Sequence, residues 1–326
     1  MVQETIRKRV IGIDISLRAT TYAIVDVRGN LNVIDSFPTL DYPDGNQFVS
    51  VLSDRIIDMV ERNGGYDSIR SIGISAPSAN FTTSSIVNAP NLPWKGVLPL
   101  GALLRDRTGY AVAVANNAAV RALGERAYGL AKGMRDFVVI TMGNGIGSCV
   151  FSNGMIHKGS DGFAGEIGHT CLVNGGRQCS CGNKGCLETY VAAKGIVATA
   201  SELLAQTSEP SLMRGVEGLT PKMITEFCEQ GDKLAIEVYR RTGEMFGLGL
   251  ANYASMVDPE AFIFTGGISR AGKWLFEPAK EKFDRYVFHN TCGKTKFLVS
   301  EDDRVENDVL GASVLAWEVR EYSLFK

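Results

Sequence analysis

The sequence lacks an excess of charge of either sign. Lys and Arg number 34 against 36 Asp and Glu, the formal net charge is -2, and no long run of one sign occurs. Such a chain does not attract nucleic acid or an anionic membrane in bulk, so neither is expected as a partner.

Long apolar runs are also lacking. Residues 1–9 are polar and lead straight into an apolar strand, so no signal peptide is expected. The longest uncharged stretch, residues 137–156, is long enough to raise the question of a membrane span. Glycine and polar residues interrupt it, and the pattern is typical of a strand, a turn and a second strand.

The cysteines do not form a disulfide pattern. Three of the seven, Cys179, Cys181 and Cys186, fall within eight residues, a spacing typical of metal binding. The other four are scattered and are expected to be small core residues. They are Cys149, Cys171, Cys228 and Cys292. This usage fits a reducing, cytoplasmic location.

His169 precedes the three clustered cysteines and completes a set of four ligands. One imidazole and three thiolates make a closed tetrahedral zinc site, which leaves no position for a reactive water. The zinc is therefore expected to hold the loop at residues 169–186, here called the cysteine loop, rather than to catalyse. Free thiols are the alternative, which four such residues within 18 disfavour. Cys171 is a possible substitute ligand, although it lies very close to His169.

The length and the order of apolar runs indicate two domains. A chain of 326 residues fits two domains of roughly 100–200 residues each. Three short strands open the chain, with a hairpin signal at Gly29-Asn30, and a second block starting at Phe137 repeats their order. We therefore expect a duplicated α/β unit. Residues 1–117 and the C-terminal helix at 307–326 should form one domain, and residues 118–306 the other.

Hydrophobic periodicity gives the expected elements. Strands are expected at residues 10–14, 22–27, 32–37, 69–76, 111–115, 137–142, 147–152, 155–157, 261–265 and 296–299. Helices are expected at residues 48–63, 98–108, 117–129, 187–206, 221–229, 232–257, 274–285 and 307–322. Residues 77–94 are expected to be rich in loops.

Two runs carry a resemblance to a known family. GEIGH at residues 165–169 and CSCGNKGCLETY at residues 179–190 resemble the ROK family of sugar kinases, such as glucokinase, and related repressors. The resemblance extends from Asp14 to Gly311, and the combination of the two runs is highly specific. It implies an α/β, actin-like (ribonuclease-H-like) fold of two domains with a cleft between them. It also implies the zinc site and a homodimer.

The repressors of this family carry a winged helix-turn-helix before the first strand. Only 13 residues precede Asp14 in this sequence, so such a domain is not expected. The resemblance therefore implies a protein that does not bind DNA.

The resemblance implies a set of sugar-binding residues: Asn91, Asn116, Glu166, His169 and Glu188. Amide and carboxylate groups suit sugar hydroxyls because they pair with them as donors or acceptors. One nitrogen of His169 would hold zinc while the other faces the sugar. Local alternatives are a turn residue at Asn91, a helix cap at Asn116, and solvated carboxylates at Glu166 and Glu188.

The catalytic base of the family is missing from its expected position. The family places an Asn-Asp pair where this sequence has Asn116-Asn117. An amide cannot accept a proton at neutral pH, and loss of a general base typically costs about 10²–10⁴ in rate. Phosphoryl transfer also depends on positioning and charge, so the loss need not be total.

The first phosphate loop also differs from the family pattern of Asp-x-Gly-Gly-Thr. It reads DISLR from Asp14 to Arg18, so Ser16 and Leu17 add side chains where backbone amides should approach phosphate. Arg18 would pair either with a phosphate or with an acidic neighbour that closes the loop. Asp14 would help to hold Mg²⁺.

The second phosphate loop, residues 143–147, is closer to the family pattern. It contains Gly143, Asn144 and Gly145, with Asn144 where Thr is usual. Gly266 and Gly267 match the turn on the adenosine side. Glycine turns after strands are common, so a plain strand-to-helix turn is the alternative.

The resemblance implies a ROK-type sugar kinase that would transfer the γ-phosphate of Mg-ATP to a hexose or N-acetylhexosamine, with low activity. Structural zinc and Mg-ATP are the expected cofactors, and a small-molecule sugar is the expected partner. The alternative is a catalytically inactive sugar sensor or regulatory protein, because the base and the first phosphate loop both depart from the family pattern.

Overall fold

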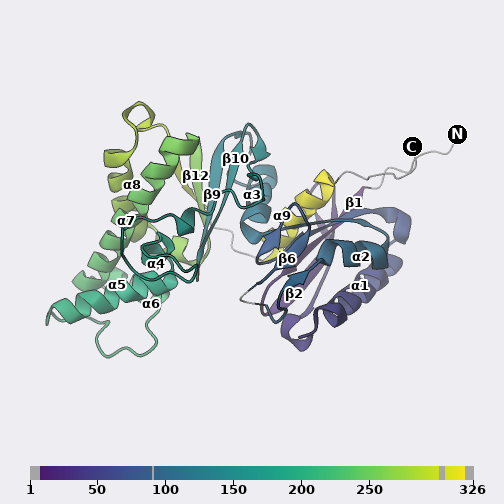
Figure 1. The fold of residues 1–326 in the computed structure, drawn as a ribbon, viewed down its shortest axis with the longest axis horizontal. Coiled ribbons are helices and arrows are strands. Elements are labelled where there is room, and N and C mark those ends of the chain that lie inside the picture. Colours follow the sequence, from purple (N-terminus) through teal and green to yellow (C-terminus); the bar gives the residue numbers. More distant parts are fainter. Residues whose placement is uncertain (1–7, 90–91, 301–304, 320–326) are drawn as a thin grey trace. The chain divides into compact units, whose positions relative to one another are not determined.

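The computed structural model describes residues 8–89, 92–300 and 305–319. Contacts divide the chain into two compact units, each with its own sheet (Figure 1). The first unit comprises the described residues of 1–132, 159–163 and 304–326, and the second those of 133–158 and 164–303. This division follows Lys132 rather than residue 117, because helix α3 (Asn117–Tyr128) packs against helix α9 (Val305–Glu318) of the first unit.

The sheet of the first unit has the strand order β3-β2-β1-β4-β8. The first three strands pair antiparallel and the β1–β4 and β4–β8 pairs are parallel. The strands are β1 (Arg9–Ile15), β2 (Ala19–Asp26), β3 (Leu31–Pro38), β4 (Ile69–Ser75) and β8 (Ala111–Ala115).

Side chains of β1 alternate between the two faces of this sheet, as the pleat requires. Ile11, Ile13 and Ile15 pack in one core with helices α1 (Gly45–Arg62) and α2 (Leu100–Thr108). Val10 packs on the other face with residues of helix α9. In Figure 1, α1 and α2 accordingly lie on one side of the sheet and α9 on the other.

Two strand glycines let helix α9 approach the sheet closely. A Cβ at Gly12 would lie 2.2 Å from the carbonyl oxygen of Val309, and one at Gly73 would lie 2.0 Å from that of Ala312. Only glycine allows backbone to meet backbone in this way. Asp14 follows Gly12 by two residues, so its side chain faces α9 as well.

The sheet of the second unit has the order β11-β10-β9-β12-β13, which repeats the order of the first. Its strands are β9 (Phe137–Met142), β10 (Ile146–Ser152), β11 (Met155–Ile156), β12 (Ala261–Thr265) and β13 (Lys296–Val299). The first three again pair antiparallel and the others parallel. The predicted duplication of an α/β unit is confirmed.

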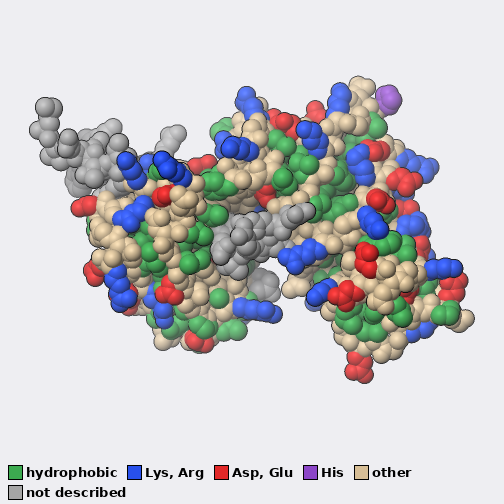
Figure 2. Space-filling model, turned by 180° about the vertical axis from the view of Figure 1, so that it is seen from behind, with side chains coloured by type: hydrophobic (Ala, Val, Ile, Leu, Met, Phe, Trp, Pro, Cys, Tyr) green, Lys and Arg blue, Asp and Glu red, His purple; other side chains and the backbone are tan. Residues whose placement is uncertain are grey.

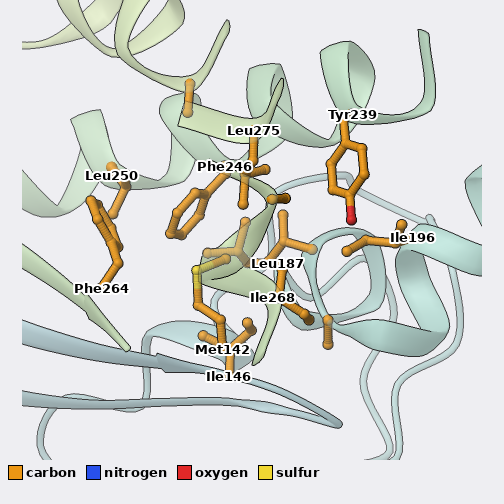
Figure 3. Packing of buried hydrophobic residues seen from close by; sticks show 14 of the residues in the cluster. Met142, Ile146, Leu187, Ile196, Tyr239, Phe246, Leu250, Phe264, Ile268 and Leu275 are labelled. Carbon is orange, nitrogen blue, oxygen red and sulfur yellow. The ribbon is translucent and has the colours of Figure 1, made fainter. Parts of the chain in front are cut away.

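One large apolar core fills the second unit. It joins strands β9 and β12 to helices α5 (Ala193–Gln206), α6 (Pro221–Glu229), α7 (Lys233–Val257) and α8 (Lys273–Tyr286). Figure 3 shows part of it, with side chains from β9, β12, α7 and α8 packed together.

The described residues of 77–94 are rich in loops, as expected, and they also contain β5 (Ala79–Asn80) and β6 (Ser85–Val87), which form a small antiparallel sheet with β7 (Val97–Leu98). Other expectations differ from the structure. Of the four cysteines expected in the core, Cys171 and Cys292 are exposed. The helix expected at residues 187–206 is split into α4 (Glu188–Val191) and α5, because Ala192 is extended, with φ -78° and ψ 171°.

No helix within the described part of the chain is both long and apolar enough to span a membrane. On the face shown in Figure 2, basic and acidic side chains are interspersed over both units. This mixture agrees with the near balance of charge in the sequence.

Candidate functional site

The predicted zinc ligands converge in the cysteine loop of the second unit. The ligand atoms of His169, Cys179, Cys181 and Cys186 all lie within 4.8 Å of one another. Nδ1 of His169 lies 3.6 Å from Sγ of Cys179, and Sγ of Cys181 lies 3.7 Å from Sγ of Cys186. His169 ends a 3-10 turn, Ile167–His169, which orients its ring toward the thiols.

These separations fit a tetrahedral zinc ion. With Zn–S bonds of about 2.3 Å and Zn–N bonds of about 2.0–2.1 Å, tetrahedral edges are about 3.8 Å between sulfurs and about 3.6 Å between sulfur and nitrogen. Nδ1 of His169 is therefore the nitrogen that faces the metal position, and Nε2 is left for another partner. Cys171 lies outside the cluster and donates to the carbonyl of Lys184 instead.

The thiols need a cation in order to ionise together. Burial, together with the neighbouring Cys179 and Cys181, raises the pKa of Cys186 to about 12. The pKa of Cys181 is lowered, chiefly by a hydrogen bond from the backbone of Asn183. A divalent metal removes the repulsion among thiolates, and a coordinated thiol is deprotonated outright.

Arg177 fastens the cysteine loop to helices α4 and α5. Nη1 donates to the carbonyls of Thr189 and Gly195, both at 3.0 Å. Nε and Nη2 donate to the carboxylate of Glu202 at 3.1 and 2.7 Å, and Nη2 also donates to the Thr199 hydroxyl at 3.0 Å. All five N–H groups of the guanidinium are satisfied.

The break between α4 and α5 frees two backbone groups that the site uses. In a continuous helix the amide of Ala193 would donate to the carbonyl of Thr189. Because Ala192 is extended, that carbonyl accepts from Arg177, and the Ala193 amide donates to the carbonyl of Gly143 at 3.0 Å.

Residues 143–147, here called the glycine turn, connect β9 to β10. The Gly143 amide donates to the carbonyl of Gly145 at 3.0 Å, and Asn144 is exposed at the tip. The amide of Ile146 donates to Oε2 of Glu188 at 2.8 Å. A predicted sugar-binding carboxylate and the predicted phosphate-binding turn are thus in direct contact.

The remaining predicted residues of the second unit are Glu166, before the cysteine loop, and Gly266 and Gly267, after β12. Glu166 is exposed, and its charge adds to the burial that raises the pKa of Tyr253 to about 12. The carbonyl of Gly165, next to Glu166, accepts a hydrogen bond from the hydroxyl of Ser148 on β10. Gly266 and Gly267 follow β12 directly, and the Ser269 hydroxyl donates to the Gly266 carbonyl at 2.7 Å.

The first unit holds Asp14 at the end of β1, facing helix α9. Asp14 is buried, and its Oδ1 has no hydrogen-bond partner among the described residues. Burial raises the pKa of Asp14 to about 7, and the charge of Asp308 contributes to the rise. The Ser75 hydroxyl and the Arg121 guanidinium oppose it. Arg121 also forms an ion pair with Asp308, with Nε 2.8 Å from Oδ1.

The turn after Asp14 is closed by its own hydrogen bonds. The Ser16 amide donates to the Ala19 carbonyl at 3.0 Å, and the Ala19 amide donates to the Ser16 hydroxyl at 3.2 Å. Leu17 and Arg18 are exposed. Within the described ranges Arg18 has no carboxylate partner, so Ser16 rather than an acidic neighbour closes the turn.

Asn116 and Asn117 begin helix α3. Oδ1 of Asn116 accepts a hydrogen bond from the Ala119 amide at 2.8 Å, so Asn116 is a helix cap. Its amide N–H groups and the second lone pair of Oδ1 remain for a ligand. Asn117 is the first helical residue and is half-buried. Asn91 lies outside the described residues.

Several residues of these sites carried no signal in the sequence. Asp308 and Arg121 lie within helices expected only from apolar spacing, and Arg177 is a single basic residue in a loop. Their roles depend on contacts between distant segments. Side-chain types likewise give no indication that the backbone amide of Ile146 contacts Glu188.

Comparison with known proteins places the chain among sugar kinases and repressors. The ROK family model matches residues 10–319. A glucokinase of Halalkalibacterium halodurans is 31% identical over 300 residues, which cover 89% of each chain. The xylose repressor of Bacillus subtilis (strain 168) is 27% identical over 296 residues, covering 89% of this chain and 72% of the repressor.

A solved structure of a sugar kinase is also similar to this chain. The ROK family glucokinase from Streptomyces griseus in complex with glucose and AMPPNP is 28% identical, with a TM-score of 0.72. The match covers 95% of this chain and 100% of that chain. The predicted actin-like, two-domain α/β fold is confirmed.

The first prediction concerns zinc. Elemental analysis of the purified protein should find about one zinc per chain, because the four ligands form a closed site. Cys181→Ser should lose most of it, whereas Cys171→Ser, also at an exposed cysteine of the loop, should keep it. A metal-free wild-type chain, or full zinc in Cys181→Ser, would contradict the site.

The second prediction concerns Asp14 and pH. An Asp whose pKa is raised on folding binds its proton more tightly in the folded state than in the unfolded state. The proton therefore adds to the free energy of unfolding in full below the unfolded pKa of about 3.9, and this contribution is lost as pH rises through the folded pKa. That value is about 7 for Asp14. Asp14→Asn removes this loss, which is at most about 4 kcal/mol. Thermal unfolding without Mg²⁺ or nucleotide should therefore show the variant gaining on the wild type between pH 5.5 and pH 8.

The exposed Asp106→Asn on α2 is the control for this measurement, and its unfolding should follow the wild type at both pH values. Parallel pH profiles for Asp14→Asn and the wild type would show that Asp14 is not the strained carboxyl described here.

Proposed function

The chain belongs to the ROK family and is a relative of its sugar kinases, and from that premise we propose that it transfers the γ-phosphate of Mg-ATP to a hydroxyl of a hexose or N-acetylhexosamine. The Streptomyces griseus glucokinase was solved with glucose and AMPPNP, so both classes of ligand are known for a relative. We take glucose as the first sugar to test.

A single contact carries this proposal. Oε2 of Glu188 accepts the hydrogen bond of the Ile146 amide at 2.8 Å, which joins a sugar-binding carboxylate to a phosphate-binding turn. A phosphotransferase needs its acceptor and its phosphate held side by side, because correct positioning supplies much of its rate.

The cysteine loop would serve sugar recognition. Zinc held by Nδ1 of His169 and the three thiolates would fix the ring and the loop without taking part in the reaction. Nε2 of His169 would then meet a sugar hydroxyl, with Glu166 and Glu188 as further acceptors. Asn116 would donate through its amide nitrogen, while one lone pair of its oxygen caps helix α3.

The first unit offers a place for Mg²⁺. Oδ1 of Asp14 is buried without a hydrogen-bond partner among the described residues, and a second carboxyl, Asp308, is close enough to raise the pKa of Asp14. Oxygen ligands of this kind suit Mg²⁺, which usually takes one or two carboxylates together with phosphate oxygens. The ion would also relieve the repulsion between the two carboxyls.

Asn117 limits the rate in this scheme. It stands at the position of the family's base, at the start of helix α3, and it cannot take the proton of the attacking hydroxyl. Transfer would then depend on positioning and on charge stabilisation, and it would be slow.

The second candidate is a sugar-binding sensor, and the β1–β2 turn favours it. The amides of Ser16 and Ala19 are used within the turn, so they are not free to bind phosphate. Together with Asn117 in place of the base, this closed turn is what we would expect of a family member that binds sugar but does not use ATP. Sugar binding without nucleotide binding in calorimetry would decide for the sensor.

The third prediction separates the two functions. An assay of ADP release with glucose should detect slow turnover in the wild type, and Asn117→Asp should raise kcat by about 10²-fold, because it restores a general base. The N-terminus of helix α3 would hold that carboxyl ionised. Asn117→Ala is the matched control and should give no gain.

Wild-type turnover at the rate of ordinary sugar kinases would exclude the sensor. No gain in Asn117→Asp, in a chain that binds both ligands, would assign the defect to the closed turn at Ser16–Ala19 instead of the missing base.

A further inference from the structure

The glycine turn is held at both of its ends by the segment that carries Glu188. At one end the Gly143 carbonyl accepts from the Ala193 amide at 3.0 Å, which the break in the helix makes available. At the other end the Ile146 amide donates to Oε2 of Glu188 at 2.8 Å. The α4–α5 segment therefore sets the shape of the turn.

The two oxygens of Glu188 are in different situations. Oε2 is engaged by the Ile146 amide, while Oε1 has no hydrogen-bond partner among the described residues. Glu188 is half-buried, so Oε1 remains within reach of a ligand. One carboxylate can thus accept from the turn and from a sugar hydroxyl at the same time.

The apolar side of the same elements makes this contact rigid. Ile146 belongs to the glycine turn, and Leu187 directly precedes Glu188. Both are buried in one core with Met142 and Ile268 (Figure 3). Buried side chains in a close-packed core do not move independently. A shift of α4 would therefore move the start of β10, and a shift of β10 would move α4.

The cysteine loop fixes the other side of α4. The Leu187 amide donates to the Thr170 carbonyl at 2.9 Å, and the Thr189 hydroxyl donates to the carbonyl of the ligand Cys186 at 2.7 Å. Arg177 adds its bond to the Thr189 carbonyl. Glu188 lies between these contacts, so its position is set by the loop before any ligand arrives.

We propose that Glu188 is a positioning residue for the glycine turn as well as a sugar ligand. Its Oε2 holds the Ile146 amide while its Oε1 accepts from the sugar, so sugar occupancy and the conformation of the turn are coupled through one carboxylate. The identity of the two ligands rests on the proposed function; the coupling between Glu188 and the turn rests on the contacts above.

Gly145 offers a way to break the contact without removing the carboxylate. A Cβ at Gly145 would lie 2.7 Å from Oε2 of Glu188. The obstructed atom is the end of a flexible side chain, so Gly145→Ala should turn Glu188 away at little cost to the fold. Gly143→Ala is the matched control, because its Cβ would meet no atom within 4 Å.

The fourth prediction uses hydrogen exchange of the Ile146 amide in the full-length, zinc-loaded protein without ligand. Loss of a hydrogen bond to a charged group should speed exchange by at least about tenfold in Gly145→Ala and in Glu188→Ala. Glu188→Gln should stay within a few-fold of the wild type, because its amide oxygen can still accept. Gly143→Ala should not change.

Glucose supplies the second readout. It should protect the Ile146 amide in the wild type by about fivefold or more and give no protection in Gly145→Ala, measured at a glucose concentration that calorimetry finds to saturate each protein. Equal exchange in the wild type, Gly145→Ala and Glu188→Ala would overturn the proposal, as would equal protection by glucose in all of them.

These readouts also distinguish this proposal from the proposed function. Exchange without ligand tests the contact even if the protein transfers no phosphate, and protection by glucose tests the coupling even if ATP does not bind. Absent turnover with the predicted exchange pattern would reject the kinase and keep the role of Glu188.

Discussion

The hydrogen bond from the Ile146 amide to Glu188 is the constraint that ties together the candidate site of the second unit. It joins the turn after β9 to the helix that follows the cysteine loop. The break at Ala192 adds a second bond, from Ala193 to Gly143, and Arg177 occupies the carbonyl that the break exposes. The cysteine loop, Glu188 and the glycine turn are thus connected by hydrogen bonds, and we propose that they behave as one body.

The first unit shows a different balance. Asp14 is held next to Asp308 by the close approach of α9, and the amides of Ser16 and Ala19 are used within the turn that follows Asp14. Asn117 begins helix α3. In the function that we propose, the groups that would recognise sugar match the family pattern, whereas those that would handle phosphate and the proton depart from it. This contrast is the physical reason for the slow transfer that we propose.

The sequence predicted what depends on local pattern. The repeated order of short apolar runs predicted the duplicated sheets, and the spacing of His169 and the three cysteines predicted a cluster whose geometry fits zinc. The sequence did not predict the break at Ala192, because the Ala193 amide, instead of bonding within a helix, donates to the carbonyl of Gly143, about fifty residues earlier in the chain. Nor did the sequence predict that Asp14 lies near Asp308, since this proximity requires helix α9 to pack closely against Gly12 and Gly73.

The claim that sugar recognition and the glycine turn form one body can be tested on the wild-type protein alone. Calorimetry should measure the affinity for AMPPNP with Mg²⁺, first without sugar and then with saturating glucose. We expect glucose to strengthen nucleotide binding by about tenfold, a coupling free energy of about 1.4 kcal/mol, because glucose fixes the Glu188 carboxylate that holds the glycine turn. The same affinity with and without glucose would contradict it.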